Sequence, residues 1–208
     1  MRCTAYYIAA ALVALGTTLN AATFNFVTDP FSGSDALTTP GRQIVANETF
    51  ISFSPSSDVF AFNLSTFGVS NLSFANNVIA NIPATGVNVV VLETFDDDAN
   101  AGTAFGAGNA ANLIAAQLTT SGPGFFIYFN SALNLPRLVY STDLSDNTAD
   151  LKILARMTNL TGQSSALPSF TSANFTAVPE PSTFLLLAIA GVFGLCGQRL
   201  RGRRNRAA

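Results

Sequence analysis

Short apolar runs separated by turn-forming residues are the feature that most restricts the fold of this chain. Between residues 23 and 177, stretches rich in Phe, Val, Ile and Thr alternate with clusters of Gly, Pro, Asn, Asp and Ser. Runs of this length with such punctuation are typical of β-strands, and many short strands favour a β-sandwich. The pattern predicts nine strands: Thr23–Val27, Glu48–Phe53, Val59–Asn63, Ser70–Phe74, Val87–Phe95, Phe125–Asn130, Arg137–Ser141, Leu151–Met157 and Ser169–Ala177.

The side-chain pattern within these runs indicates how they pack. In Leu151–Met157 the odd-numbered residues are apolar and predict one buried face, with Lys152 and Arg156 on the other. Val87–Phe95 is more continuously apolar, which is typical of a central strand covered on both faces. The chain has eighteen Phe and no Trp. Phe needs no buried hydrogen-bond partner, so this choice predicts a phenylalanine-filled core between two sheets, rather than a sugar-binding platform.

One segment breaks the β pattern and predicts a helix inserted among the strands. In Ala107–Leu118 the apolar residues recur at helical spacing, with Asn109 as the expected N-cap and Ser121–Gly124 as the stop. We expect this helix to pack across an end or edge of the sandwich. Its start, Gly106–Ala111, superficially fits the dinucleotide-binding pattern G-x-G-x-x-A. The pattern predicts no β-α-β unit around it and the preceding loop is acidic, so we expect no nucleotide there.

The charge distribution excludes one class of partner. Residues 23–178 hold eleven acidic and four basic side chains, a formal charge of −7. Such a domain repels phosphate backbones, so we expect no nucleic-acid binding.

The N-terminus has the layout of a secretory signal peptide, which we assign to residues 1–22. Arg2 is followed by an uncharged apolar stretch, Ala5–Leu19, and then by small residues. We expect cleavage after Ala21 or Ala22. Cys3 would leave with this segment and Cys196 lies in the C-terminal apolar run, so the domain at 23–177 has no disulfide and depends on its core.

The C-terminal segment, residues 178–208, has three parts in a fixed order. The sequence Val178-Pro179-Glu180-Pro181-Ser182 precedes an apolar run, Phe184–Gly197. This run is short against the roughly 20 residues of a transmembrane helix. With Ser182, Thr183 and Leu200 added, and with Arg199 and Arg201 snorkelling, it predicts a marginal transmembrane helix. An arginine cluster comes next, and the positive-inside rule places it in the cytoplasm: Arg199, Arg201, Arg203, Arg204 and Arg206.

These three parts resemble the PEP-CTERM sorting signal. The resemblance implies recognition by exosortase, a membrane-embedded cysteine transpeptidase of Gram-negative bacteria that make extracellular polysaccharide. It also implies export through the inner membrane, a transient anchor there, and cleavage near Pro179-Glu180-Pro181. The segment from Tyr128 to Gly162 resembles ectodomains carried by such proteins, and this second resemblance implies no activity.

The residues that could carry catalysis are few. The chain contains no His, which excludes Ser-His-Asp and Cys-His catalysis and a His-based zinc site. An acid-pair glycoside hydrolase could use Glu48 and Glu93, the domain's two Glu, but nothing in their spacing selects a pair. We therefore predict no enzymatic activity and no required cofactor.

One acidic stretch is a weak candidate for calcium. Asp96, Asp98 and Asn100 alternate like the first ligands of an oxygen-ligand calcium loop. The match then fails, because Ala101 and Ala107 stand where an EF-hand has Gly and Glu. The sequence thus predicts a non-catalytic surface or matrix protein associated with exopolysaccharide and biofilm. The alternative is an exported calcium- or carbohydrate-binding module.

Overall fold

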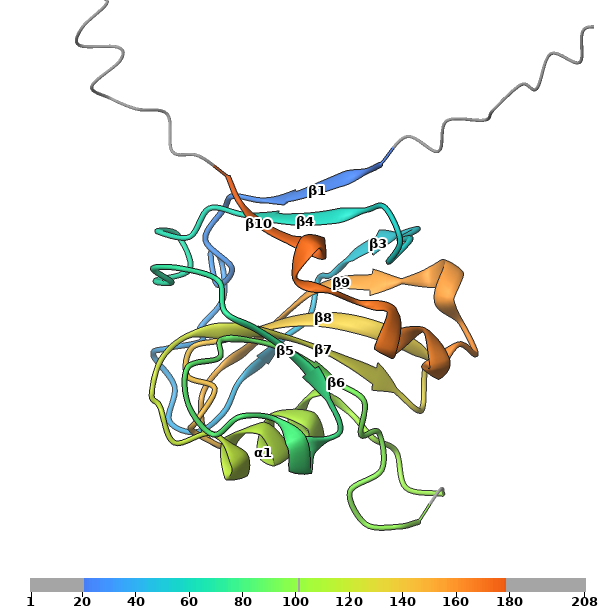
Figure 1. Ribbon diagram of the computed structural model, residues 1–208. Coiled ribbons are helices and arrows are strands. Elements are labelled where there is room, and N and C mark those ends of the chain that lie inside the picture. Colours follow the sequence, from blue (N-terminus) through green and yellow to red (C-terminus); the bar gives the residue numbers. More distant parts are fainter. Residues whose placement is uncertain (1–20, 101, 179–208) are drawn as a thin grey trace, which may run out of the picture.

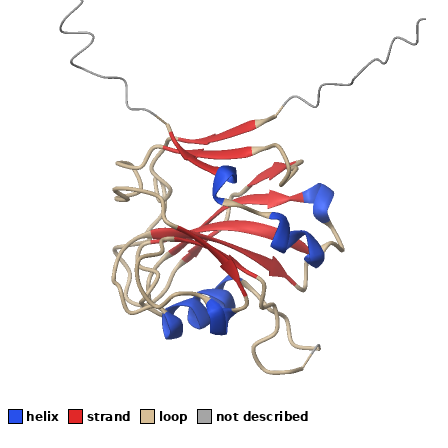
Figure 2. Ribbon diagram, in the orientation of Figure 1, coloured by secondary structure: helices blue, strands red, loops and turns tan. Residues whose placement is uncertain are grey.

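The computed structural model describes residues 21–100 and 102–178. Most of the predicted signal peptide, and the tail from Pro179 onward, lie outside these residues. The described part is mainly β, as predicted, and forms three layers (Figures 1 and 2): a small sheet, a large sheet and one α-helix. Within the described residues no helix is long and apolar enough to cross a membrane. The predicted apolar span falls outside them.

The small sheet contains three parallel strands in the order β1-β4-β10. They are β1 (Thr23–Phe26), β4 (Val59–Phe62) and β10 (Phe175–Ala177). Both outer strands pair with β4, so the first and last strands of the domain lie on either side of one central strand.

The large sheet is mixed and has the order β2-β9-β8-β7-β6-β5, with β3 also pairing with β9. The β7–β8 and β8–β9 pairs are antiparallel and the other pairs are parallel. The strand bounds are β2 (Ile44–Val45), β3 (Thr49–Ile51), β5 (Phe74–Asn77), β6 (Val89–Leu92), β7 (Gly124–Asn130), β8 (Leu135–Ser141) and β9 (Leu151–Met157).

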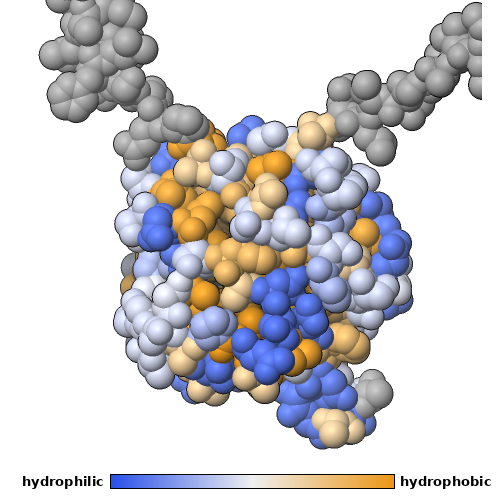
Figure 3. Space-filling view, viewed as in Figure 1, coloured by the Kyte–Doolittle hydropathy of each residue, from blue (hydrophilic) through white to orange (hydrophobic). Residues whose placement is uncertain are grey.

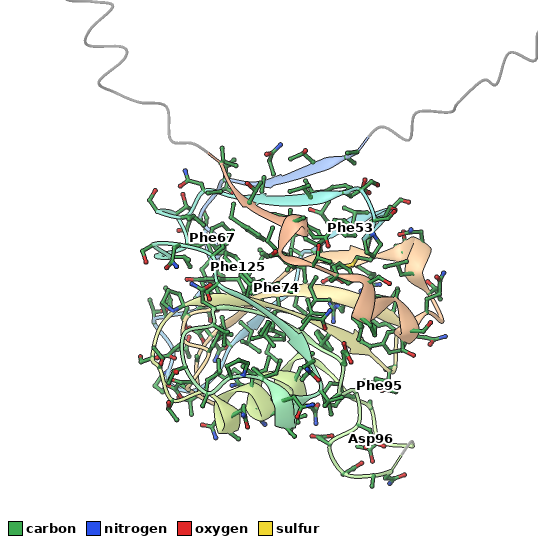
Figure 4. All side chains as sticks on the ribbon, in the orientation of Figure 1. Phe53, Phe67, Phe74, Phe95, Asp96 and Phe125 are labelled. Atoms are coloured by element: carbon green, nitrogen blue, oxygen red, sulfur yellow. The ribbon has the colours of Figure 1, made fainter. Side chains whose placement is uncertain are left out.

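A phenylalanine layer fills the space between the two sheets. Nine of the eighteen Phe are buried in this core, which confirms the predicted use of Phe (Figure 4). Phe53 and Phe60 stack at 4.1 Å between ring centroids, and Phe62 of the small sheet stacks on Phe125 of the large sheet at 3.9 Å. These ring contacts join the sheets without requiring a buried hydrogen-bond partner.

The helix α1 (Ala107–Gln117) covers the opposite face of the large sheet. Its buried residues Ala110, Ala111 and Ile114 belong to a second core with Val90 and Phe126. The predicted position at an end or edge was therefore wrong. A continuously apolar strand such as β6 needs cover on both faces, and α1 supplies the second one.

The helix start also differs from the prediction. The N-cap is Gly106, and Asn109 lies in the first turn, where its Oδ1 accepts the Gly106 amide at 3.1 Å. In addition, β6, α1 and β7 form a β-α-β crossover between adjacent parallel strands, which the sequence pattern had not predicted. The glycine pattern Gly106–Ala111 does not follow β6 directly, because the segment 93–105 lies between them.

Two further predictions about strands were wrong. The strand placed at Ser70–Phe74 lies at Phe74–Asn77, and in Ser169–Ala177 only Phe175–Ala177 is a strand, since Ser169 and Ser172–Asn174 belong to 3₁₀-helices. The described residues form four 3₁₀-helices: η1 (Ile79–Asn81), η2 (Thr158–Leu160), η3 (Ser164–Ser169) and η4 (Ser172–Asn174).

The apolar residues of β9 do not share one face. A register irregularity places Val139 opposite Ile153 but Leu138 opposite Ala155, so Leu154 is an extra residue on β9. Such a bulge reverses the alternation of the strand. Leu151 and Ile153 pack in the core under α1, whereas Ala155 and Met157 pack in the phenylalanine layer.

Candidate functional site: the strand that leads into the tail

The last strand of the domain runs directly into the tail. β10 pairs with β4 from Phe175, opposite Phe60, to Ala177, opposite Phe62. Beyond the strand, the amide of Val178 donates to the carbonyl of Phe62 at 2.7 Å. The next residue, Pro179, has no amide hydrogen and cannot continue the pairing.

Asn174 fixes the start of β10. This residue is 3% exposed, and its Nδ2 donates to the carbonyls of Pro55 and Asp58, both at 2.8 Å. Its Oδ1 accepts the amide of Thr171 at 2.8 Å. The aromatic ring of Phe175 then packs on Phe60 and Phe74 at centroid distances of 5.8 and 5.5 Å. A strand of three residues is thus held firmly, and the tail leaves the domain from a fixed point.

Comparison with known protein families identifies the segment that begins at the end of this strand. Residues 177–204 match the family model described as the PEP-CTERM protein-sorting motif. The chain carries a PEP-CTERM sorting motif. The predicted resemblance is confirmed, and the motif implies export, a transient membrane anchor and exosortase as the sorting partner. The match begins at Ala177, the last residue of β10.

No curated protein and no solved structure matches the chain significantly. The residues predicted to be read in the tail, Pro179, Glu180, Pro181 and Ser182, and the arginines from Arg199 to Arg206 lie outside the described residues. Their individual roles stay predictions.

The acidic candidate lies on a loop that projects beyond α1. Figure 3 shows this loop as a hydrophilic projection, and Figure 4 places Asp96 on it. The structure brings one carboxylate oxygen each from Asp96, Asp97 and Asp98 to within 4.8 Å of one another, all on exposed residues. Asp97, which the alternating pattern left out, therefore joins the cluster.

Backbone amides of the same loop already donate hydrogen bonds to several side-chain oxygens of the predicted calcium ligands. Asp96 Oδ1 accepts the amide of Asp98 at 3.1 Å, and Asp98 Oδ1 accepts that of Asn100 at 2.9 Å. Asn100 Oδ1 accepts the amide of Gly102 at 3.1 Å. The hydrogen bond from the Asn100 amide is the largest cause that lowers the pKa of Asp98. The Ala107 position, where an EF-hand has Glu, is buried in the first turn of α1.

The Glu48 carboxylate is part of a buried ion-pair cluster and is unsuited to acid catalysis. Its Oε2 accepts from Arg137 Nη2 at 2.7 Å, and its Oε1 accepts from Arg156 Nη2. Burial alone would raise the pKa of Glu48, but the two arginines outweigh it and hold the pKa below its usual value. A general acid needs the opposite shift. This arrangement therefore gives no support to Glu48 as the general acid of a hydrolase.

An open polar pocket of about 320 Å³ lies where the loops before β5, β6 and β7 meet. Its lining carries no charged side chain and includes Ser70, Asn71, Ser73, Asn88 and Ser121. Asn88 is held in place, because its Oδ1 accepts the Ser73 amide at 2.8 Å and its Nδ2 donates to the Asn71 carbonyl at 2.7 Å. Sequence reasoning missed this pocket, since its residues come from separate turns with no shared motif.

Proposed function

We propose that the protein is exported, cleaved by exosortase in its tail, and delivered to the cell surface or matrix as a non-catalytic component associated with exopolysaccharide. The observation that supports this most is the sorting motif at residues 177–204, which starts at the last strand of a folded β domain. The domain folds up to Val178, so the tail can be handled by a membrane enzyme without unfolding it.

The test monitors the tail in strains with and without exosortase. With the enzyme, we expect the full chain to be converted to a shorter form that leaves the membrane. Replacing Pro179, Glu180 and Pro181 by Ala should leave the long form in the membrane. Replacing the exposed loop residue Pro83 by Ala is the control, and it should process normally. Equal processing of both variants would count against the sorting role.

The matrix association has its own assay. The processed protein should sediment with exopolysaccharide purified from the same organism, whereas a protein found entirely free of the polymer would contradict this part of the proposal. The uncharged pocket supports the carbohydrate-binding alternative, because hydroxyl and amide groups suit neutral sugars. In that case, the pocket-filling Ser70→Tyr variant should lose polymer binding and the distant Ser56→Tyr variant should retain it.

The three clustered carboxylates support the calcium-binding alternative. Hard cations such as calcium bind carboxylate and amide oxygens. If the loop binds calcium, millimolar calcium should raise the melting temperature of the wild type, and the Asp96→Asn/Asp98→Asn double variant should abolish the increase. An unchanged melting temperature would exclude this alternative.

A further inference from the structure

A buried carboxylate lies beside the start of the first strand. Asp58 is 6% exposed, and its oxygens accept three hydrogen bonds from neutral donors. Oδ1 accepts the Ala22 amide at 2.9 Å and the Ser57 hydroxyl at 3.0 Å, and Oδ2 accepts the Ser54 amide at 2.9 Å. In the part of the chain that the structure describes, both ion pairs belong to Glu48 and none to Asp58.

Asp58 is a negative charge without a cationic partner among the described residues. Burial alone would raise the pKa of Asp58, but the hydrogen bonds from Ala22, Ser54 and Ser57 outweigh it and lower the pKa. The group is therefore a carboxylate at neutral pH. A buried charge of this kind is stabilised most by an opposite charge at hydrogen-bond distance.

Ala22 is also the residue at which the predicted signal peptide ends. Its carbonyl accepts the Val59 amide at 2.9 Å, so its backbone already pairs with the start of β4. The sequence leaves two candidate cleavage bonds, Ala21–Ala22 and Ala22–Thr23, and they have different consequences at Asp58.

Hydrolysis of the Ala21–Ala22 bond adds one water across it. Ala21 keeps the new carboxylate, and the nitrogen of Ala22 takes up protons and becomes an ammonium. That nitrogen already lies 2.9 Å from Asp58 Oδ1. Hydrolysis of the Ala22–Thr23 bond would instead remove the Ala22 amide from Asp58 and the Ala22 carbonyl from Val59, and it would leave the buried Asp58 carboxylate and the Val59 amide each short of a partner.

We propose that export processing cleaves the Ala21–Ala22 bond and that Asp58 is the buried counter-ion of the new N-terminal ammonium. The inference rests on the proposed function, because it requires the chain to be exported. The mature domain then gains an ion pair that the precursor lacks. The ion pair stabilises the turn Ser54–Asp58, whose Asp58 carbonyl also accepts from Asn174 just before β10.

The first experiment locates the mature N-terminus. The full chain is produced with its own signal segment in a Gram-negative host, and the exported protein is analysed by intact mass and N-terminal peptide mapping. We expect a single N-terminus at Ala22. An exported protein that starts at Ala21 or Thr23 overturns this inference and leaves export standing. A chain kept unprocessed in the cytoplasm overturns both.

The second experiment tests the ion pair on the exported protein. The native protein is treated with an amine-methylating reagent, and the sole lysine, Lys152, serves as the internal reference. We expect the Ala22 amine to react at least tenfold more slowly in the native wild type than in native Asp58→Asn. Ser57→Ala removes one donor but neither charge, so it should stay protected.

The Ser57→Ala variant also keeps the test decisive if Asp58→Asn fails to fold. In that case the native Ser57→Ala protein is compared with its own urea-unfolded form, where the same tenfold difference is expected. An Ala22 amine that reacts equally fast in native and unfolded protein overturns the ion pair.

Discussion

The Glu48 cluster allows a sharp test of what holds the large sheet together. Glu48 lies before β3, Arg137 is on β8 and Arg156 is on β9, so the cluster joins three segments. The side chains of Glu48, Arg137 and Arg156 are 6%, 10% and 26% exposed. Glu48→Gln keeps the volume of the side chain but removes the carboxylate with which both Arg137 and Arg156 pair among the described residues.

The size of the expected loss is set by this burial. Removing one partner of a buried ion pair costs about 3–5 kcal/mol. For a domain of this size, that corresponds to a decrease in melting temperature of roughly 6–20 °C. Glu93→Gln is the matched control, because Glu93 is partly exposed and the ion pairs among the described residues do not include it. Its effect should stay within about 0.5 kcal/mol.

The pH dependence separates the charge from the packing. The pKa of Glu48 is lower in the folded protein than its ordinary value of about 4.3. Its stabilising effect is therefore present above that ordinary value and is lost as the pH falls through the folded value. Thermal unfolding measured by circular dichroism should show a large difference between wild type and Glu48→Gln at pH 7 that narrows below about pH 4. A difference that is absent at pH 7, or unchanged in acid, would refute the reasoning.

Two further predictions concern packing and a third concerns the hydrogen bonds of Asn174. Phe62→Ala removes a fully buried ring and should cost about 3–5 kcal/mol in urea unfolding, with Phe62→Leu losing clearly less. Gly124→Ala places a Cβ 2.4 Å from the Asn88 carbonyl oxygen and should cost about 1–3 kcal/mol, whereas Gly108→Ala in α1 meets nothing closer than 3.8 Å and should be neutral or stabilising. Asn174→Ala removes the donor to the carbonyls of Pro55 and Asp58, so hydrogen exchange of the Val178 amide should accelerate at least tenfold.

The long strands of the large sheet were predictable because their pattern is strong. Each of the strands β7, β8 and β9 has seven residues, most of them buried, and turn-forming residues flank each strand. β5 was misplaced because it contains Asn76 and Asn77, which have low strand propensity. Tertiary contacts compensate, since Asn76 Nδ2 donates to the carbonyls of Leu167 and Phe170 at 2.9 and 3.0 Å.

Other features depend on pairings that a single sequence does not encode locally. The extra residue Leu154 changes the face of β9, yet LKILARM alternates as regularly as an unbulged strand. The parallel pairing of β10 with β4 joins segments that are far apart in the chain. The Glu48–Arg137–Arg156 cluster has the same origin, so nothing in the spacing of these residues points to it. The sorting motif was predictable because its parts are contiguous and need no tertiary structure.

The small sheet explains how a domain can be cut at both ends and keep its fold. Among the described residues, Ala22 is the first whose backbone pairs along β4, through its carbonyl and the Val59 amide, and Val178 is the last, through its amide and the Phe62 carbonyl. The proposed cleavage before Ala22 and the expected cleavage near Pro179 both fall just outside these two hydrogen bonds. Cleavage at these two places would leave every pairing of β4 intact. Because β1 and β10 are both parallel to β4, the N-terminal segment enters at one end of the small sheet and the tail leaves at the other. The two proposed cleavages therefore lie at opposite ends of the same sheet.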